Sequence, residues 1–389
     1  MKNVLKILLG GLLLSSLTVQ AQVLKSLEVA LVAPISGDAA GIGKSLRFAA
    51  TLALINSRKE FEKMGFDLKL KTYDDKTLPS SARAQGKLIL GNSATLVVVG
   101  SYASDTTQAL AETLRASGVS LVSPTASSNA LTDQNFPGVN RIVARNDEIG
   151  QAAGQYIQKA LKSKRVLLLD DNSADGRDMS RNLASYLKRV KVSILSEMST
   201  SEKLNFTKVV GQIKIAKPDL IFLGFTSVKS SALIIGKMRR SGIKTPIMGT
   251  SVLADPEFRS LAGSDSRGIL YASYVAPLEA YANPKIPQFV KQFQQVLQEK
   301  PTSYSVLGYD AMNVALQGLK NAIKTAGGQK PTRGQVQKAV RAVKLPSGLS
   351  GALSFNKFGD LEQTNVYVLK IGDDFEAKLV SILPAVPGR

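Results

Sequence analysis

The sequence predicts an α/β protein with two lobes, each built on a parallel-rich β-sheet flanked by helices. Short runs rich in Val, Ile and Leu recur along the chain with little polar alternation, which is typical of strands buried on both faces of a parallel sheet. Each run is followed by a polar turn and then by a stretch with helical spacing. The chain has 389 residues, which is too long for one ordinary core and suits two.

The predicted strands form two series that divide near residue 145. The first series has runs at 27–32, 68–73, 96–99 and 120–122. The second series has runs at 165–169, 192–195, 220–223 and 246–248. After about residue 274 the pattern weakens, and late strands at 348–356 and 365–371 indicate that the chain returns to the earlier sheets.

Helices are predicted between these strands and beyond them. They lie at 42–56, 80–91, 106–116, 147–161, 176–189, 206–216, 230–241, 285–299 and 304–325. We expect Asp147 to cap one helix and Gly118 and Gly242 to end two others.

Residues 1–21 have the features of an export signal. Lys2 and Lys6 are followed by an apolar run at 7–17 and by a small-x-small cleavage site that ends at Ala21. The run is shorter than the roughly 20 residues that span a bilayer. Because no cysteine stands at the cleavage site, we expect a soluble periplasmic or extracellular protein without a lipid anchor.

The composition excludes several kinds of catalytic site. The chain contains no His and no Cys, which removes Ser-His and Cys-His catalysis, imidazole and thiolate metal sites, and disulfides. No glycine-rich phosphate loop follows a predicted strand. We therefore expect no enzyme activity, no metal and no cofactor.

The formal net charge of +20 would suit an anionic partner such as nucleic acid. No arginine-rich arm or basic stripe interleaved with aromatic residues accompanies this charge. We therefore interpret it as solvated Lys and Arg side chains on helix faces, and we expect no nucleic-acid partner.

Polar residues gather where the predicted strands end, which is where open parallel sheets bind ligands. The loop at 33–43 contains glycines that suit either a tight turn or a close backbone approach. The junctions at 100–106 and 123–129 are rich in hydroxyl groups and enter helices. Alone, Ser104 or Asp105 would suit a helix cap, but two such neighbouring junctions predict a cradle for an anion or a carboxylate.

Matching junctions of the second series lie at 170–176, 224–227 and 249–252. Their carboxylates and hydroxyls are expected to face the first set across a cleft. Asp170 and Asp171 are adjacent, but neighbouring residues at a strand end point in different directions. We expect no catalytic role for them.

Several motifs, in order, resemble those of a known family. They include VAPISG at 32–37, VSPTAS at 122–127, GIKTPIMG at 242–249 and GALSF at 351–355. The chain resembles the type I periplasmic solute-binding proteins, specifically the branched-chain (leucine/isoleucine/valine) amino-acid-binding group of ABC importers, over about residues 27–375. The resemblance implies two Rossmann-like lobes joined by a three-strand hinge, with the ligand in the cleft. Carried over, lobe 1 comprises residues 22–144 and 275–362, and lobe 2 comprises residues 145–274 and 363–389.

The resemblance also implies the binding residues. Those that match the carboxylate half of the family's site are Ser104, Thr125, Ala126 and Ser127. The family's acidic partner for an ammonium is replaced by Ser251. Residues other than the usual aromatic ones stand at Ile42, Asp175 and Ser227, so we expect a more polar cleft with fewer aromatic walls. Asp175 would supply the missing counter-charge to an ammonium; the alternative is a ligand without an amine.

These features predict an extracytoplasmic binding protein of an ABC importer. The ligand is expected to be a small carboxylate-bearing molecule, an amino acid of the branched-chain type or a related amide. A monomer would capture it by cleft closure and deliver it to a membrane ABC permease. The alternatives are a ligand-sensing regulatory protein on the same fold, or a binder of urea, short amides or an amine-free carboxylate.

Overall fold

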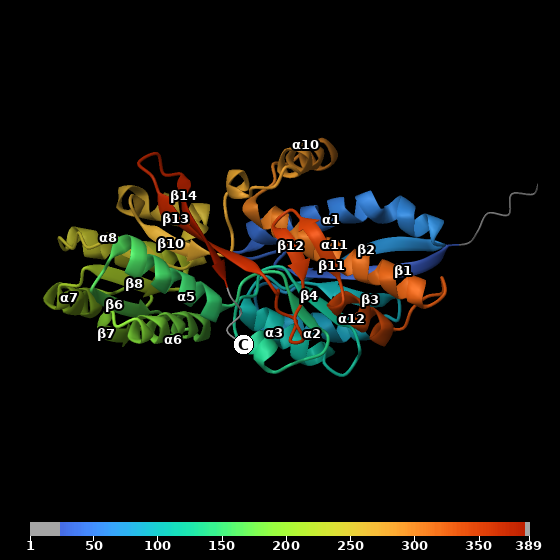
Figure 1. Cartoon of the computed structure of the whole chain (residues 1–389), viewed down its shortest axis with the longest axis horizontal. Coiled ribbons are helices and arrows are strands. Elements are labelled where there is room, and N and C mark those ends of the chain that lie inside the picture. Colours follow the sequence, from blue (N-terminus) through green and yellow to red (C-terminus); the bar gives the residue numbers. More distant parts are fainter. Residues whose placement is uncertain (1–23, 386–389) are drawn as a thin grey trace, which may run out of the picture.

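The computed structural model describes residues 24–385, so the predicted export signal at 1–21 lies outside the described residues. Two large sheets lie side by side along the long axis of the molecule (Figure 1). The first has five strands in the order β2-β1-β3-β4-β5, and the second has seven in the order β14-β13-β10-β9-β8-β6-β7. The predicted α/β class with parallel-rich sheets is confirmed.

The first sheet is parallel throughout. Its strands are β1 (Lys25–Ala33), β2 (Phe66–Asp74), β3 (Thr95–Val99), β4 (Ser120–Ser123) and β5 (Val139–Arg141). Its associated helices are α1 (Ala40–Lys63), α2 (Pro79–Leu90), α3 (Ser104–Leu114), α4 (Ala130–Asp133), α10 (Ile286–Leu297), α11 (Ser303–Thr325) and α12 (Arg333–Arg341).

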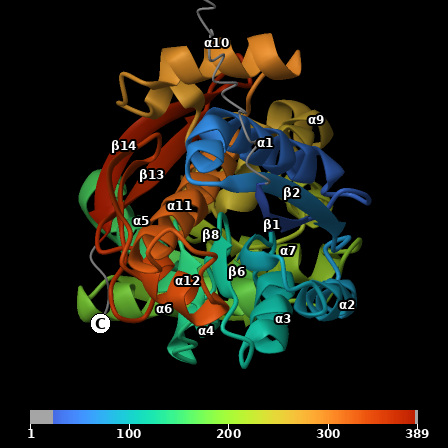
Figure 2. The ribbon, with the colours of Figure 1, turned by 90° about the vertical axis from the view of Figure 1, so that its right-hand side faces the viewer.

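Both faces of the first sheet are covered. Alternate residues of β1 point to opposite faces: Val29 and Leu31 pack with α1 and α11, whereas Ala30 and Val32 pack with α2 and α3. Figure 2 shows α1 on one side of β1 and β2, and α2 and α3 on the other. Burial on both faces explains why the strands are continuous apolar runs.

The second sheet is parallel except at β13 and β14, which pair antiparallel. Its strands are β6 (Arg165–Asp170), β7 (Ser193–Ser199), β8 (Leu220–Gly224), β9 (Ile247–Gly249), β10 (Leu270–Ser273), β13 (Thr364–Ile371) and β14 (Ala377–Ala385). One face packs on α5 (Asn146–Tyr156) and α6 (Ala174–Arg189). The other packs on α7 (Thr207–Ala216), α8 (Val228–Arg240) and α9 (Pro256–Ala262).

The chain passes between the two sheets three times, through the crossing segments 142–145, 274–285 and 355–363. The third follows a small hairpin of β11 (Lys344–Gly348) and β12 (Gly351–Ser354). The predicted late strand at 348–356 is therefore the turn and second strand of this hairpin, whereas 365–371 lies in β13. The residue-level lobe boundaries given above stay a prediction.

The eight early strands and the nine helices that the sequence predicted all form. Most ends shift by a few residues, but α1 extends to Lys63, β7 extends to Ser199, and the helix predicted at 147–161 ends as a π-helix over Ile157–Leu161. The prediction missed β5, β10, β11 and β14, as well as α4, α9 and α12. The predicted cap at Asp147 is wrong: Arg145 is the N-cap of α5, and Asp147 lies in the first turn of that helix. Gly118 and Gly242 have positive φ angles of 72° and 80° just beyond α3 and α8, as expected of residues that end helices.

Both interpretations of the glycines in the first loop hold, at different positions. Gly37 has a φ of 85°, a backbone conformation that residues other than glycine rarely adopt, and it therefore suits a tight turn. Gly43 lies in α1, where an added Cβ atom would overlap the carbonyl oxygen of Pro34. Among residues 24–385, no helix is both long enough and apolar enough to cross a membrane.

Candidate ligand-binding site

A cavity of about 550 Å³ lies where the carboxyl ends of strands from the two sheets face each other. Its walls come from the junctions after β3, β4, β6, β8 and β9 and from the crossing segment 274–285. The predicted site residues that line it are Ser104, Thr125, Ser127, Asp175 and Ser251. The structure thus brings together five of the eight residues predicted from the sequence.

The first-sheet side of the cavity is rich in hydroxyl groups, and Asp105 of α3 is its one charged residue among those the structure describes. Ser104 is the first residue of α3, and its Oγ accepts a hydrogen bond from the N–H of Ser128 at 3.3 Å. Thr125 is buried, and its hydroxyl donates to the carbonyl oxygen of Tyr102 at 2.7 Å. These bonds fasten the β3 and β4 junctions to each other, as the prediction of a shared cradle requires.

Asp175 approaches this cradle from the second sheet. It lies in the first turn of α6, and its carboxylate is close enough to the hydroxyls of Ser104 and Ser128 for them to affect its pKa. Burial raises the pKa of Asp175, and the nearby charges of Asp178 and Asp105 act in the same direction, whereas the two hydroxyls oppose the rise. Asp175 therefore provides an acceptor for a ligand group that carries hydrogen-bond donors.

A second carboxylate holds the start of α6 in place. Asp171 accepts hydrogen bonds from the hydroxyl and the N–H of Ser173 at 2.5 and 3.1 Å, and from the N–H and the hydroxyl of Thr226 at 2.8 and 2.7 Å. Although burial opposes the shift, these bonds hold the pKa of Asp171 below its ordinary value. Asp170 instead contacts Asn172 and Ser199. The two adjacent carboxylates point to different partners, as expected.

The cavity has aromatic walls at positions other than the three compared with the family. Tyr102, Phe225, Tyr274 and Tyr304 all line the cavity. The rings of Tyr102 and Tyr304 pack edge to face with their centroids 5.9 Å apart. Sequence reasoning missed these residues because it compared only the positions at which the family carries tyrosines.

Ser251 and the tyrosines form one polar wall. Ser251 and Tyr274 both line the cavity, and burial raises the pKa of Tyr274 well above its ordinary value. Burial likewise raises the pKa of Tyr102 to about 12. Both phenols therefore stay protonated at neutral pH and offer hydroxyl groups rather than charges.

The charged side chains that line the cavity are all acidic. They are Asp105, Asp175 and Asp255. The amide oxygen of Gln108, which also lines the cavity, is buried and has no hydrogen-bond partner among the described residues. Acceptors and negative charge thus predominate, which favours a ligand with at least one cationic or donor group. Within residues 24–385, no group of three or more acidic side chains is arranged to hold a metal ion.

Three predicted site residues lie outside the cavity wall. Ala126 is buried, and Ser227 caps α8 by accepting a hydrogen bond from the N–H of Ser230 at 3.2 Å. Ile42 lies in α1 and packs against the core of the first sheet. Their contacts with a ligand stay predictions.

The model of one protein family, described as periplasmic binding protein, matches residues 26–376. The chain belongs to this family. The resemblance stated from the motifs is confirmed, and the periplasmic binding protein fold accounts for the two facing sheets and the cavity between them.

The names of two relatives of this periplasmic binding protein describe them as binding branched-chain amino acids. The leucine-, isoleucine-, valine-, threonine-, and alanine-binding protein of Pseudomonas aeruginosa is 24% identical over 87% of each chain. The Leu/Ile/Val-binding protein of Citrobacter freundii is 25% identical over 92% of this chain and 94% of the relative.

Solved structures share the fold at lower identity. A leucine-binding protein from Thermotoga maritima superposes with a TM-score of 0.82, 20% identity and coverage of 93% of this chain and 99% of that one. A solute-binding protein of an ABC transporter from R. palustris, in complex with benzoate, has a TM-score of 0.76, 22% identity and coverage of 93% and 97%.

Proposed function

We propose that this periplasmic binding protein captures a small solute that carries a carboxylate, namely an amino acid of the branched-chain type or a related amide. One observation carries the proposal. The neutral cradle of Ser104, Thr125 and Ser127 lies opposite the carboxylate of Asp175 in one cavity. A zwitterion satisfies both sides, since its carboxylate suits hydroxyl and N–H donors and its ammonium suits Asp175.

An aromatic acid is the second candidate. The tyrosine walls favour it because rings pack well edge to face and offset on other rings. A fold neighbour holds benzoate. Against it stands the charge of the cavity, since Asp105, Asp175 and Asp255 offer an amine-free anion no positive partner. The zwitterion is therefore the better fit.

A thermal-shift screen of the chain from residue 22 onward tests the choice. The probes are leucine, isoleucine, valine, leucinamide, benzoate and urea. A ligand that binds only the folded protein stabilises it by about 2.7 kcal/mol at a concentration a hundred times its Kd. We expect leucine, isoleucine or valine to raise the melting temperature more than benzoate does. A shift with benzoate alone would select the aromatic acid, and no shift with any carboxylate would reject both.

Delivery to a membrane ABC permease, export after removal of residues 1–21 and a monomeric state belong to the same proposal. Deletion of the gene should abolish uptake of the bound solute by cells. Uptake that persists, together with a lost transcriptional response to the solute, would identify a sensing protein on the same fold instead. The mass of the secreted protein should correspond to a chain that begins at Gln22.

A further inference from the structure

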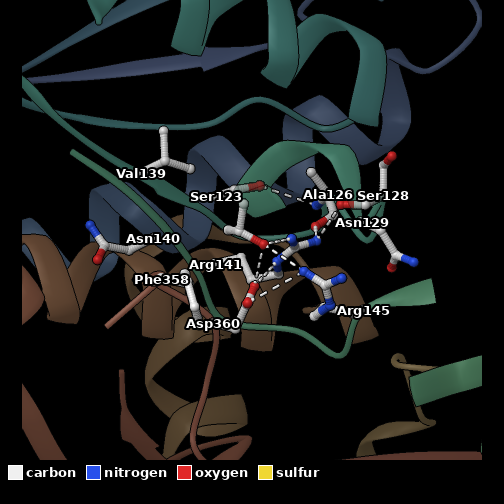
Figure 3. A network of polar contacts seen from close by, with 12 residues as sticks. Ser123, Ala126, Ser128, Asn129, Val139, Asn140, Arg141, Arg145, Phe358 and Asp360 are labelled. Carbon is white, nitrogen blue, oxygen red and sulfur yellow. Dashed lines mark hydrogen bonds and ion pairs between the residues drawn. The ribbon is translucent and has the colours of Figure 1, made fainter. Parts of the chain in front are cut away.

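The buried side chain of Arg141 is hydrogen-bonded to the loop at 124–129, which we call the cradle loop. Arg141, the last residue of β5, is 0% exposed. Its Nη1 donates to the carbonyl oxygens of Ala126 at 3.1 Å and Ser128 at 2.7 Å (Figure 3). Its Nε donates to the carboxylate of Asp360 at 2.7 Å. The planar guanidinium thus holds two loop carbonyls and one carboxylate at once.

These bonds fix the direction of the N–H groups of the loop. In a planar trans peptide, the N–H points opposite to the C=O of the same unit. Because the carbonyl of Ala126 faces Arg141, the N–H of Ser127 is turned away from Arg141. The next carbonyl, that of Ser127, accepts from the N–H of Asn146 at 2.8 Å. Among residues 24–385 the N–H of Ser127 has no protein partner, so it is available to a ligand in the cavity that Ser127 lines.

The same cluster reaches two of the crossing segments. Arg145, the N-cap of α5, donates through Nη1 to Thr132 at 2.8 Å and to Asp360 at 3.4 Å. Asp360 lies in the segment 355–363, and its neighbour Gly359 accepts a hydrogen bond from the N–H of Arg141 at 2.9 Å. Although burial alone would raise it, the charges of the two arginines hold the pKa of Asp360 below its ordinary value. Arg141 therefore links the cradle loop to the carboxylate of Asp360, and Arg145 binds the same carboxylate from another crossing segment.

We propose that Arg141 and Asp360 are positioning residues for ligand binding: they aim the Ser127 N–H at the ligand carboxylate and fix the cradle loop to the crossing segments. Neither residue touches the ligand. This inference rests on the proposed function, since it assumes that an anionic group binds at the cradle. It does not depend on which side chain the ligand carries.

The test replaces Arg141 by Lys, which keeps the positive charge and removes the planar guanidinium with its several N–H donors. The matched control is Arg341→Lys. Arg341 also donates to several backbone carbonyls, those of Pro137, Val139 and Lys357, and to the side chain of Asn140, but it does not contact the cradle loop. Both variants lose similar bonds, so a general loss of stability affects both.

Two measurements follow. Calorimetry with leucine should show at least a tenfold loss of affinity in Arg141→Lys and less than a twofold loss in Arg341→Lys. Hydrogen exchange without any ligand should be faster in the peptides that cover 124–129 in Arg141→Lys only. If Arg141→Lys does not fold, Asp360→Asn is compared with Arg341→Lys in the same two ways.

The outcomes separate the two proposals. Equal losses of affinity in the two variants, or wild-type affinity and exchange in Arg141→Lys, would overturn the positioning role. If the wild-type protein binds no leucine, the proposed function fails for that ligand. The exchange comparison still decides whether Arg141 holds the loop, and unchanged exchange there overturns the inference by itself.

Discussion

The side chains of Ser104 and Asp175 meet across the cavity, one from each sheet. A ligand carboxylate that binds Ser104 must share this space with the carboxylate of Asp175, and two like charges at such a distance repel each other. A cationic group between them removes the repulsion. The pair therefore selects ligands that carry both charges, and each residue can be tested separately.

Ser104→Ala should weaken the binding of every carboxylate ligand. Loss of one hydrogen bond to a charged group costs about 1.5–3 kcal/mol, or roughly tenfold to a hundredfold in Kd. Calorimetry with leucine and with benzoate measures the effect. Ser185→Ala is the control, because the exposed hydroxyl of Ser185 bonds only to the carbonyl of Arg181 in its own helix. Unchanged affinity in Ser104→Ala would contradict the carboxylate cradle.

Asp175→Asn should weaken only ligands that bear an ammonium. It should also stabilise the free protein near neutral pH. Burial raises the pKa of Asp175, so its contribution to stability is fully present below its ordinary pKa and is lost as the pH rises through the raised value. The Asp175→Asn variant has no titratable group at this position. The amount by which its melting temperature exceeds that of the wild-type protein should therefore grow with pH across the acidic range.

Asp374→Asn provides the opposite case for this measurement. The hydrogen bond from Lys378 lowers the pKa of Asp374, so this variant should gain no advantage as the pH rises. A melting-temperature difference for Asp175→Asn that is constant with pH would contradict the assigned burial. Equal losses of affinity for amine-bearing and amine-free ligands would contradict its pairing with an ammonium.

The predictability of the site differs from residue to residue. Ser104, Thr125 and Ser127 follow apolar strands directly, and the carboxyl ends of parallel strands converge, so their meeting follows from local pattern. Tyr274 and Tyr304 lie after β10 and at the start of α11. Only the return of the chain through a crossing segment brings them to the cavity, and no local pattern reports that return.

At the scale of elements, the continuity of apolar residues decides more than length what the sequence reveals. Strands of five to nine residues such as β1, β3 and β8 form recognisable apolar runs. The strand β5 contains one apolar residue, Val139, and so forms no run, whereas β9, which also has three residues, is recognisable from Ile247 and Met248. The strand β10 has four residues and was missed although three of them are apolar. The strand β14 is long, but its mostly exposed residues lie at the edge of the second sheet. Lys378, Ser381 and Pro384 interrupt its apolar residues, so no continuous run marks it.

The start of α1 gives an element-scale prediction. Gly43→Ala should destabilise the protein by about 1–3 kcal/mol, since the new Cβ meets the backbone carbonyl of Pro34 and forces the helix or the loop to move. Gly41→Ala in the same turn is the control: nothing lies within 4 Å of its added Cβ, and alanine favours the helix. Urea unfolding measures both. Equal stabilities for the two variants would contradict the close approach.

At the scale of the whole molecule, the charge is distributed unevenly. The chain has a formal net charge of +20, yet the charged residues that line the cavity are three aspartates. Lys and Arg are thus kept away from the ligand, and the cavity presents a local field opposite to that of the surface. This arrangement favours a cationic group inside the cavity whatever the overall charge attracts outside it.

The two sheets and the three crossing segments predict closure on binding. A ligand can shift the lobes only if it binds the closed arrangement more tightly than the open one. It does so here if it adds contacts from Asp175 and Ser251 to those from Ser104 and Ser127, since these residues belong to different sheets. Small-angle scattering should therefore show a smaller radius of gyration with saturating leucine than without it. The control is a solute that gives no thermal shift at the same concentration. An unchanged radius with a ligand that calorimetry shows to be bound would contradict the hinge, because the contacts from both sheets would then exist before the ligand arrives.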